Sequence, residues 1–354
     1  MARRYIQELR PGELIDDAVF AVRSKDLRTT TQGSLYIHAV LADRTGQLLA
    51  RVWQATEAMY NAIPDGGFVR LKGRTESYKG NLQFIIEAIR TVSPDEIDPS
   101  DFLPTTEGDV DAMWRRVVEI LGDIKQPDVA ALVSEFLADA DLMERFRRAP
   151  AAATMHHAYV GGLLEHTLNV LEVARRVIPL YPKLSLDLIL AGVFLHDIGK
   201  THELAYETTI SYTDSGQLLG HIAIAFAWVQ KKADAVAKRT GKRFPDRILW
   251  SLQHIVLSHH GCYAFGSPKL PAMPEAVAVH YLDNLDAKVN MFLAEIESDR
   301  DPVSHWTNYN RALETKIFKP DVAGARVDVP AGPAAPEHAD AVNPAAPSVS
   351  PAAP

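Results

Sequence analysis

The sequence predicts a protein of two parts, a small β-barrel followed by an all-helical domain. Within residues 1–93, five short runs rich in β-branched and aromatic residues are separated by turn residues. From residue 111 to about residue 319, apolar residues instead recur at three- and four-residue spacing, which is the period of an α-helix. A hydrophobic fraction of 47% over 354 residues is enough to build a packed core in each part.

The five strand-like runs are short and end at turn signals such as Asp43-Arg44-Thr45-Gly46. They occupy residues 17–30, 34–46, 47–53, 67–80 and 81–92. A helix-like insert, residues 55–63, separates the third strand from the fourth. Five strands in so short a segment favour a closed barrel, and their order resembles an OB-fold of the nucleic-acid-binding type.

Composition divides the rest of the chain. We expect residues 94–110, which are rich in Asp and Glu, to form an acidic linker, and residues 111–319 to form the helical domain. The segment 320–354 is rich in Ala and Pro and lacks aromatic residues, so we expect a disordered tail. No internal repeat is evident.

Charge and cysteine content narrow the class of protein. Cys262 is the only cysteine, which excludes a disulfide framework and a thiolate metal cluster. The first residues lack the apolar run of a secretory signal, and no apolar run is long enough for a bilayer, so we expect a cytoplasmic protein. The net charge is −8, yet residues 1–93 hold 13 Lys/Arg against 10 Asp/Glu, a balance compatible with nucleic acid.

Histidines and aspartates interrupt the apolar faces of five predicted helices. His166 continues the stripe of Leu163 and Val170, and His221 falls in line with Leu218 and Ala225. The other members of the set are His196, Asp197, His259, His260 and Asp283. Any one of them alone could be a hydrogen-bonded core residue. Burying the whole set without mutual compensation is costly, and metal coordination supplies that compensation.

The pattern resembles a known superfamily. The stretches GGLLEHT, FLHDIGK, GHI, LSHHG and YLDNLDAKVN are similar to the HD superfamily of metal-dependent phosphohydrolases. Together with the barrel, the chain resembles the YhaM-type 3′-to-5′ exoribonucleases over roughly residues 10 to 318. The segment after His260-Gly261 runs CYAFGSPKLP and has no GYP motif, which argues against cyclic-di-GMP hydrolysis.

The resemblance implies a divalent metal site. One ion would be held by His166, His196, Asp197 and Asp283. A second ion, if present, would share Asp197 and add His221, His259 and His260, and the extra histidines favour two ions. Manganese is the expected metal, with iron, cobalt or magnesium as alternatives. A histidine-rich shell argues against magnesium alone at the tighter site.

Three residues are predicted to act on the phosphate. Asp197 would bridge the metals, and Lys200 and His157 are the candidate phosphate contacts. The alternative for Lys200 is a solvated lysine at a helix C-terminus. Asp286, one turn after Asp283, would orient a ligand or act only as a hydrogen-bond acceptor. His156 is expected at the surface.

The barrel carries the candidate nucleic-acid contacts. Tyr78 and Lys79, at a predicted hairpin tip, are the best exposed candidates, and Arg51, Lys72 and Arg74 supply further charge. Aromatic residues also occur at Tyr36, Trp53, Phe68 and Phe84. Most of these five aromatics are expected in the barrel core, because a small barrel must be filled.

These observations favour a hydrolase, a 3′-to-5′ exonuclease of single-stranded RNA; the preference between RNA and single-stranded DNA stays open. An HD phosphohydrolase acting on a small nucleotide, with the barrel as a regulatory or oligomerisation module, is the alternative. A non-catalytic nucleic-acid-binding factor with a structural metal is the third hypothesis, and it would be favoured by missing ligands, of which there are none. A homo-oligomer is compatible with the sequence.

Overall fold

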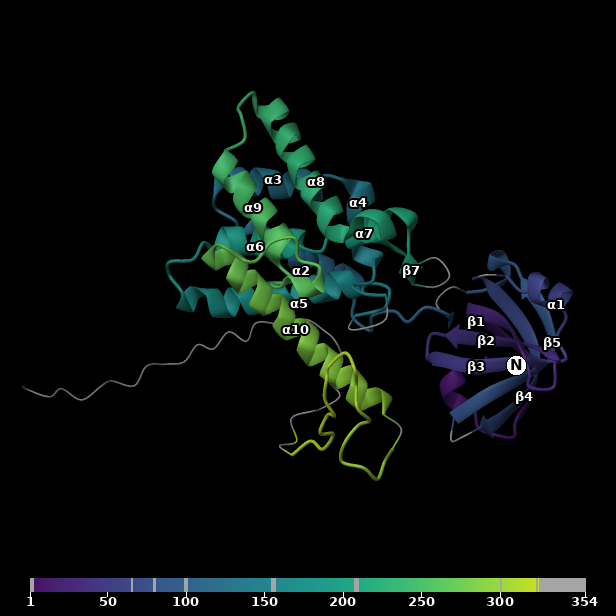
Figure 1. Ribbon diagram of the computed structural model, residues 1–354. Coiled ribbons are helices and arrows are strands. Elements are labelled where there is room, and N and C mark those ends of the chain that lie inside the picture. Colours follow the sequence, from purple (N-terminus) through teal and green to yellow (C-terminus); the bar gives the residue numbers. More distant parts are fainter. Residues whose placement is uncertain are drawn as a thin grey trace, which may run out of the picture.

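The computed structural model shows a barrel beside a larger helical part (Figure 1). It describes residues 3–64, 66–78, 81–98, 101–153, 157–206, 210–299, 301–322 and 324. Lys79, His156 and nearly all of the predicted tail lie outside the described residues. Among the helices described, none combines the length and the apolar character needed to cross a membrane.

The N-terminal part is a closed five-stranded barrel, as predicted. Its elements are β1 (Leu14–Thr29), β2 (Leu35–Asp43), β3 (Gly46–Trp53), α1 (Glu57–Ala62), β4 (Phe68–Tyr78) and β5 (Asn81–Val92). The strands close in the order β1-β2-β3-β5-β4, and β1 pairs with both β2 and β4. Only β3 and β5 run parallel, and the remaining pairs are antiparallel. The predicted OB-type barrel is therefore confirmed.

Strand alternation decides which barrel residues reach solvent. Along β3, Leu48, Ala50 and Val52 are at most 4% exposed and fill the barrel. The alternate residues of β3, including Arg51 and Trp53, point outward because successive side chains of a strand lie on opposite faces. The outer face of β3 therefore presents a cation next to a large aromatic ring.

The predicted linker packs against the barrel rather than lying free of it. Phe102 stacks on Phe68, with ring centroids 4.6 Å apart. Asp101 accepts a 2.7 Å hydrogen bond from the hydroxyl of Tyr5. Farther along, Arg23 on β1 donates a 3.3 Å hydrogen bond to the carbonyl of Ile210, which belongs to the helical part. This last contact joins the barrel to the region of β7 (Ser211–Tyr212) (Figure 1).

Nine α-helices follow in the described part of the chain beyond the linker. They are α2 (Val110–Gly122), α3 (Pro127–Leu137), α4 (Ala140–Arg148), α5 (Gly162–Val177), α6 (Leu186–Leu195), α7 (Lys200–Glu203), α8 (Asp214–Thr240), α9 (Asp246–Ser258) and α10 (Pro274–Ser298). Side-chain caps start several of them: Asp109, Ser185 and Thr213 each accept a backbone N–H from the first turn of α2, α6 and α8. The helical domain predicted from the change of period is confirmed.

The core of the helical part lies around α6. Phe194 is 1% exposed and its ring meets Phe136 and Phe146 at centroid distances of 6.3 and 5.5 Å. After Asp187 in its first turn, helix α6 is apolar throughout, and its residues 189–195 are all buried by the surrounding elements. The C-terminal end of this buried helix delivers His196 and Asp197 to the interior.

Candidate metal centre

The helices of the second part bring all seven predicted ligand residues together. His166 lies on α5, His196 caps α6 and Asp197 follows it. His221 lies on α8, Asp283 on α10, and His259 and His260 follow the end of α9. His166, His196 and His259 are each at most 1% exposed.

Four of these residues form a first group, which we call group A: His166, His196, Asp197 and Asp283. The Nε2 atoms of His166 and His196 lie 3.4 Å apart. Asp283 Oδ1 lies 3.3 Å from His166 Nε2 and 3.8 Å from His196 Nε2. Asp197 Oδ2 lies 3.4 Å from His196 Nε2. His166, His196 and Asp197 each offer a ligand atom within 4.8 Å of the others, and Asp283 lies beside the two imidazoles.

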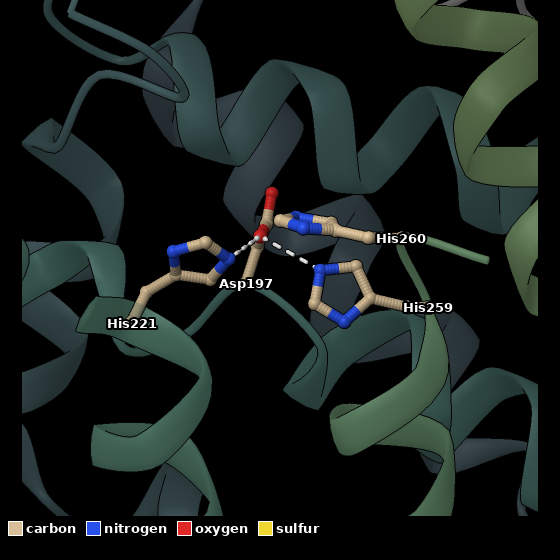
Figure 2. A group of neighbouring side chains, drawn as sticks. All are labelled: Asp197, His221, His259 and His260. Atoms are coloured by element: carbon tan, nitrogen blue, oxygen red, sulfur yellow. Dashed lines mark ion pairs between the residues drawn. The ribbon is translucent and has the colours of Figure 1, made fainter. Parts of the chain in front are cut away.

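A second group, group B, consists of Asp197, His221, His259 and His260. Its ligand atoms all lie within 4.8 Å of one another. Asp197 Oδ1 is 3.3 Å from His221 Nε2 and 3.6 Å from His259 Nε2. Figure 2 shows the imidazoles gathered around the Asp197 carboxylate. Asp197 therefore belongs to both groups, with one oxygen facing each.

Every imidazole of the two groups has its Nδ1 bonded to an acceptor. His166 Nδ1 donates to Asp286 at 2.7 Å, and His221 Nδ1 donates to Glu203 at 2.9 Å. The acceptors for the other three are backbone carbonyls: Val193 for His196, Phe265 for His260 and Val256 for His259. Because Nδ1 donates a hydrogen bond in each case, Nε2 is the nitrogen of each ring that faces the site.

Three buried polar atoms at the centre of group B have no hydrogen-bond partner. They are Asp197 Oδ1, His221 Nε2 and His259 Nε2. Burying a polar atom without a partner is costly, and such atoms are rare in folded proteins. All three are lone-pair donors that face one another, so a divalent cation would satisfy them together. The donor set of imidazole and carboxylate suits borderline transition metals.

The electrostatics of group A show how strongly it attracts a positive charge. Burial by itself lowers the pKa of His166, but the carboxylates of Asp283 and Asp286 outweigh it and raise that pKa to about 10. For Asp283, burial opposes ionisation, yet the hydrogen bond from His166 and the charge of His196 hold its pKa well below the ordinary value. A proton on His166 thus takes the place that a metal cation would occupy.

Group B is different, because its histidines are neutral. Burial lowers the pKa of His221 and of His259 despite the nearby carboxylates. Burial and the neighbouring His259 lower the pKa of His260 to about 4. Neutral imidazole is the form that binds metal, so group B is prepared for a cation at neutral pH.

A kink in α8 brings His221 into the site. Gly220 has φ +72° and ψ 157°, a conformation outside the helical region that favours glycine. As a result Leu218 is 83% exposed while His221 is 8% exposed, so the predicted common stripe of these two residues was wrong. Gly199 permits this packing, because a Cβ there would lie 2.1 Å from the carbonyl oxygen of His221.

Lys200 lies at the site, where it was predicted to contact a phosphate. In the structure its ammonium contacts a carboxylate of the protein. Its ammonium lies 2.6 Å from Asp197 Oδ2. Burial by itself lowers the pKa of Lys200, but the charge of Asp197 raises it overall. The same ion pair helps to keep the pKa of Asp197 well below its ordinary value, against the effect of burial. Lys200 also lines the cavity that opens at the site.

The structure places His157 elsewhere than predicted. Its ring is buried, with Nδ1 2.6 Å from the hydroxyl of Tyr159 and Nε2 3.1 Å from Asp286. With both nitrogens engaged, His157 has no nitrogen left for a phosphate. It instead stands behind Asp286, which in turn holds His166.

Two residues of the site were missed by sequence reasoning. Glu203 accepts hydrogen bonds from both the backbone N–H and the Nδ1 of His221. His280 Nδ1 donates to the carbonyl of His259 at 2.7 Å. Neither residue has a spacing signal that links it to its partner, because Glu203 and His221 are 18 residues apart across the kinked start of α8.

The barrel holds a separate cluster around Arg51, which we call the barrel platform. The Arg51 guanidinium lies 5.2 to 5.8 Å from the ring centroids of Tyr36, Trp53 and Tyr78. Trp53 is 43% exposed and Tyr78 is 46% exposed. An arginine among exposed aromatic rings suits stacking of nucleic-acid bases.

The other predicted barrel contacts do not belong to the barrel platform. Arg74 pairs with Glu87 and Lys72 with Asp16, each at 3.0 Å. Their charges are thus partly balanced at the surface, and Lys79 lies outside the described residues. The expectation that most of the five aromatics proposed above lie in the barrel core was wrong. Of these five, only Phe68 and Phe84 are buried, and the other three, Tyr36, Trp53 and Tyr78, are those of the barrel platform.

A cavity of about 380 Å³ opens at the two ligand groups. Its walls include Asp197, Lys200, His259, His260 and Asp283. A larger cavity of about 720 Å³ lies between the end of α5 and the start of α10, and it is lined almost wholly by apolar residues. Since none of the ligand residues lines the larger cavity, the smaller one is the candidate active-site cleft.

Comparison with known proteins agrees with this geometry. Residues 163–288 match the model of the HD domain family. The 3′-5′ exoribonucleases YhaM of Geobacillus sp. (strain WCH70) and of Bacillus subtilis (strain 168) are each 33% identical to the chain over 308 residues. These matches cover 87% of this chain and 92% and 95% of the relatives.

Solved structures match only part of the chain. The second OB-fold domain of replication protein A from Methanococcus maripaludis is 18% identical and covers 26% of this chain and 96% of its own, with a TM-score of 0.22. The relation to the two relatives instead extends through the barrel and the helical part alike. The chain belongs to the family of the 3′-5′ exoribonuclease YhaM.

Proposed function

We propose that this protein is a metal-dependent hydrolase that removes nucleotides from the 3′ end of single-stranded RNA. The observation that carries the proposal is the place of Asp197, whose two oxygens face two groups of buried ligands. The family relation supports the substrate class, since the two relatives are named 3′-5′ exoribonucleases. Single-stranded DNA is a second substrate of the same chemistry.

We propose two divalent ions, with manganese as the preferred metal. His166, His196, Asp197 and Asp283 would hold one, and Asp197, His221, His259 and His260 would hold the other. When bound, such ions supply a water of lowered pKa and neutralise charge on the phosphoryl oxygens. Iron and cobalt suit the same ligands, while magnesium suits a histidine-rich set less well.

The chain's own residues prepare the site for this chemistry. Glu203 and Asp286 fix two imidazoles through their Nδ1 atoms, so that the rings cannot turn away. Lys200 lines the cleft and places a positive charge beside Asp197, where the phosphoryl oxygens of the substrate would lie. Hydrolysis adds water across one P–O bond, and the positive charge of Lys200, together with that of bound cations, would favour the negative charge that develops on the phosphoryl oxygens.

We assign the RNA contact to the barrel platform. Arg51 lies among three aromatic rings, of which Trp53 and Tyr78 are more than 40% exposed. Base stacking on such rings tolerates any sequence, as an exonuclease requires. Among the described residues, no carboxylate lies within ion-pair distance of Arg51, so its charge is available to a phosphate.

The test uses 5′-labelled single-stranded RNA with added Mn²⁺. The proposal predicts a ladder that shortens from the 3′ end and stops when a chelator is added. An RNA whose 3′-terminal linkage is a non-hydrolysable phosphonate should remain intact, whereas an endonuclease would still cut within it. Intact RNA together with rapid hydrolysis of a small nucleotide would replace the proposal with a nucleotide phosphohydrolase.

A further inference from the structure

One face of α10 forms a wall of the active-site cleft. His280, Asp283, Asn284, Ala287, Lys288 and Met291 all line the cavity of about 380 Å³. They follow one another at three- and four-residue spacing, so they form a single stripe along the helix. The cleft therefore extends beyond the ligand Asp283 toward the C-terminal half of α10.

Lys288 stands in this extension as an uncompensated cation. It lies five residues after Asp283, about 7.5 Å farther along the helix axis. Within the described residues, no carboxylate lies within ion-pair distance of its ammonium. Lys200, the other lysine of the cleft, is already paired with Asp197 at 2.6 Å. An ammonium without a carboxylate partner, in the same cavity as the ligand groups, is suited to bind an anionic part of the substrate that lies beyond those groups.

Phe265 adds an aromatic ring to the same cavity. It ends the short 3-10 helix Tyr263–Phe265 and its side chain is 66% exposed. Its carbonyl accepts the 2.7 Å hydrogen bond from His260 Nδ1, which fixes the backbone of Phe265 next to a ligand. An exposed ring at a fixed place in a cleft is a stacking surface for a base.

We propose that Lys288 binds the phosphate next to the one being hydrolysed, on its 5′ side, and that Phe265 stacks against a base of the terminal nucleotides. This subsite rests on the proposed exonuclease function. It would hold the last nucleotides of the strand in register. After each hydrolysis, the next linkage would then take the place of the one that was cleaved. Lys288 and Phe265 are substrate-binding residues in this proposal, and neither belongs to the ligand groups.

The test is a thermodynamic cycle in which the charge of Lys288, the charge of the phosphate, or both are removed. Two RNAs are compared, one unmodified and one with an uncharged methylphosphonate at the linkage next to the terminal one. The first cleavage is measured under single-turnover conditions for the wild type, Lys288→Gln and Lys288→Arg. Lys242→Gln is the matched control, because Lys242 lies in the α8–α9 connection, at the opposite end of α9 from His259.

We expect Lys288→Gln to lower kcat/KM on unmodified RNA by about tenfold or more, the range for a charge-assisted hydrogen bond. The methylphosphonate should slow the wild type by a similar factor and slow Lys288→Gln no further, while Lys288→Arg should retain most of the activity. Additive losses, or a wild type insensitive to the methylphosphonate, would overturn the assignment. A wild type unable to shorten unmodified RNA would instead overturn the proposed function.

The role of Phe265 is tested with variants that remove or keep an aromatic ring while the side chain stays apolar. Phe265→Leu should lower kcat/KM about tenfold, in line with loss of one stacked base, and Phe265→Trp should restore it. Equal activity of the Leu and Trp variants would remove Phe265 from the subsite. Manganese content should be the same in all of these variants, because the backbone carbonyl that holds His260 is retained.

Discussion

Glu203 accepts two hydrogen bonds from His221, one from the backbone N–H and one from Nδ1, each 2.9 Å long. The two hydrogen bonds therefore fix the backbone of α8 just after the kink at Gly220 and the rotation of the His221 ring. Burial opposes ionisation of Glu203, but its hydrogen bond with His221 holds its pKa below the ordinary value. A buried carboxylate that belongs to neither ligand group thus sets the direction of one predicted ligand.

Replacing Glu203 should weaken the metal centre. Glu203→Ala frees the His221 ring to rotate and is expected to lower metal affinity by about 10- to 100-fold. Glu203→Gln, which keeps one oxygen as an acceptor, should lose less. Titration of the metal-free protein with Mn²⁺ measures both. Glu135→Ala is the control, since Glu135 pairs with Arg239 at the surface; an affinity in Glu203→Ala equal to that of this control would contradict the assignment.

Metal binding should release a proton from His166. Its pKa of about 10 means that the ring is protonated in the metal-free protein at neutral pH, and Nε2 must lose that proton to bind a cation. The lowered pKa values of His221, His259 and His260 leave those rings neutral at pH 7, so they release none. Raising the pH toward 10 removes the competing proton, and affinity should rise about tenfold per unit.

Calorimetric titration in buffers of different ionisation enthalpy measures this release. We expect about one proton per chain at pH 7 in the wild type. In Asp286→Asn the pKa of His166 falls, because a carboxylate that raises it is gone, and fewer protons should be released. A binding heat that is the same in every buffer would show that His166 is already neutral.

The barrel platform should matter for long RNA and not for the chemistry. Replacing Trp53 and Tyr78 by Ala is expected to raise the Kd for a long single strand by roughly tenfold or more, because each stacked base contributes about 1–3 kcal/mol. Hydrolysis of a dinucleotide should be unchanged. Trp250→Ala is the control, because Trp250 is a similarly exposed ring on α9. Equal losses on long RNA and on the dinucleotide would argue against the platform.

Much of the architecture could be predicted from the sequence, since strand and helix periods differ and the break between them falls near residue 110. The seven candidate ligands were also predictable, because each is a titratable residue on an apolar face. Local spacing could not reveal the kink at Gly220, where φ +72° breaks a helix that looks continuous in sequence. It therefore placed Leu218 and His221 on one face, although one is exposed and the other buried.

The residues that hold the ligands were harder to predict than the ligands. Glu203 and His221 meet only after the chain turns through β6 (Leu204–Ala205) and β7, and no periodicity connects them. The same holds for the barrel aromatics. Whether Tyr36, Trp53 and Tyr78 face inward depends on strand register, and a shift of one residue would exchange the two faces.

The most direct test of the central claim compares the wild type with Asp197→Ala on 5′-labelled single-stranded RNA in Mn²⁺. Bound manganese is measured in the same samples. Because Asp197 offers one oxygen to each ligand group, its loss should abolish the 3′-to-5′ ladder and lower the metal content, while the wild type shortens the strand completely. A variant that still produces the ladder would contradict the assignment of Asp197 as the shared ligand of the catalytic site.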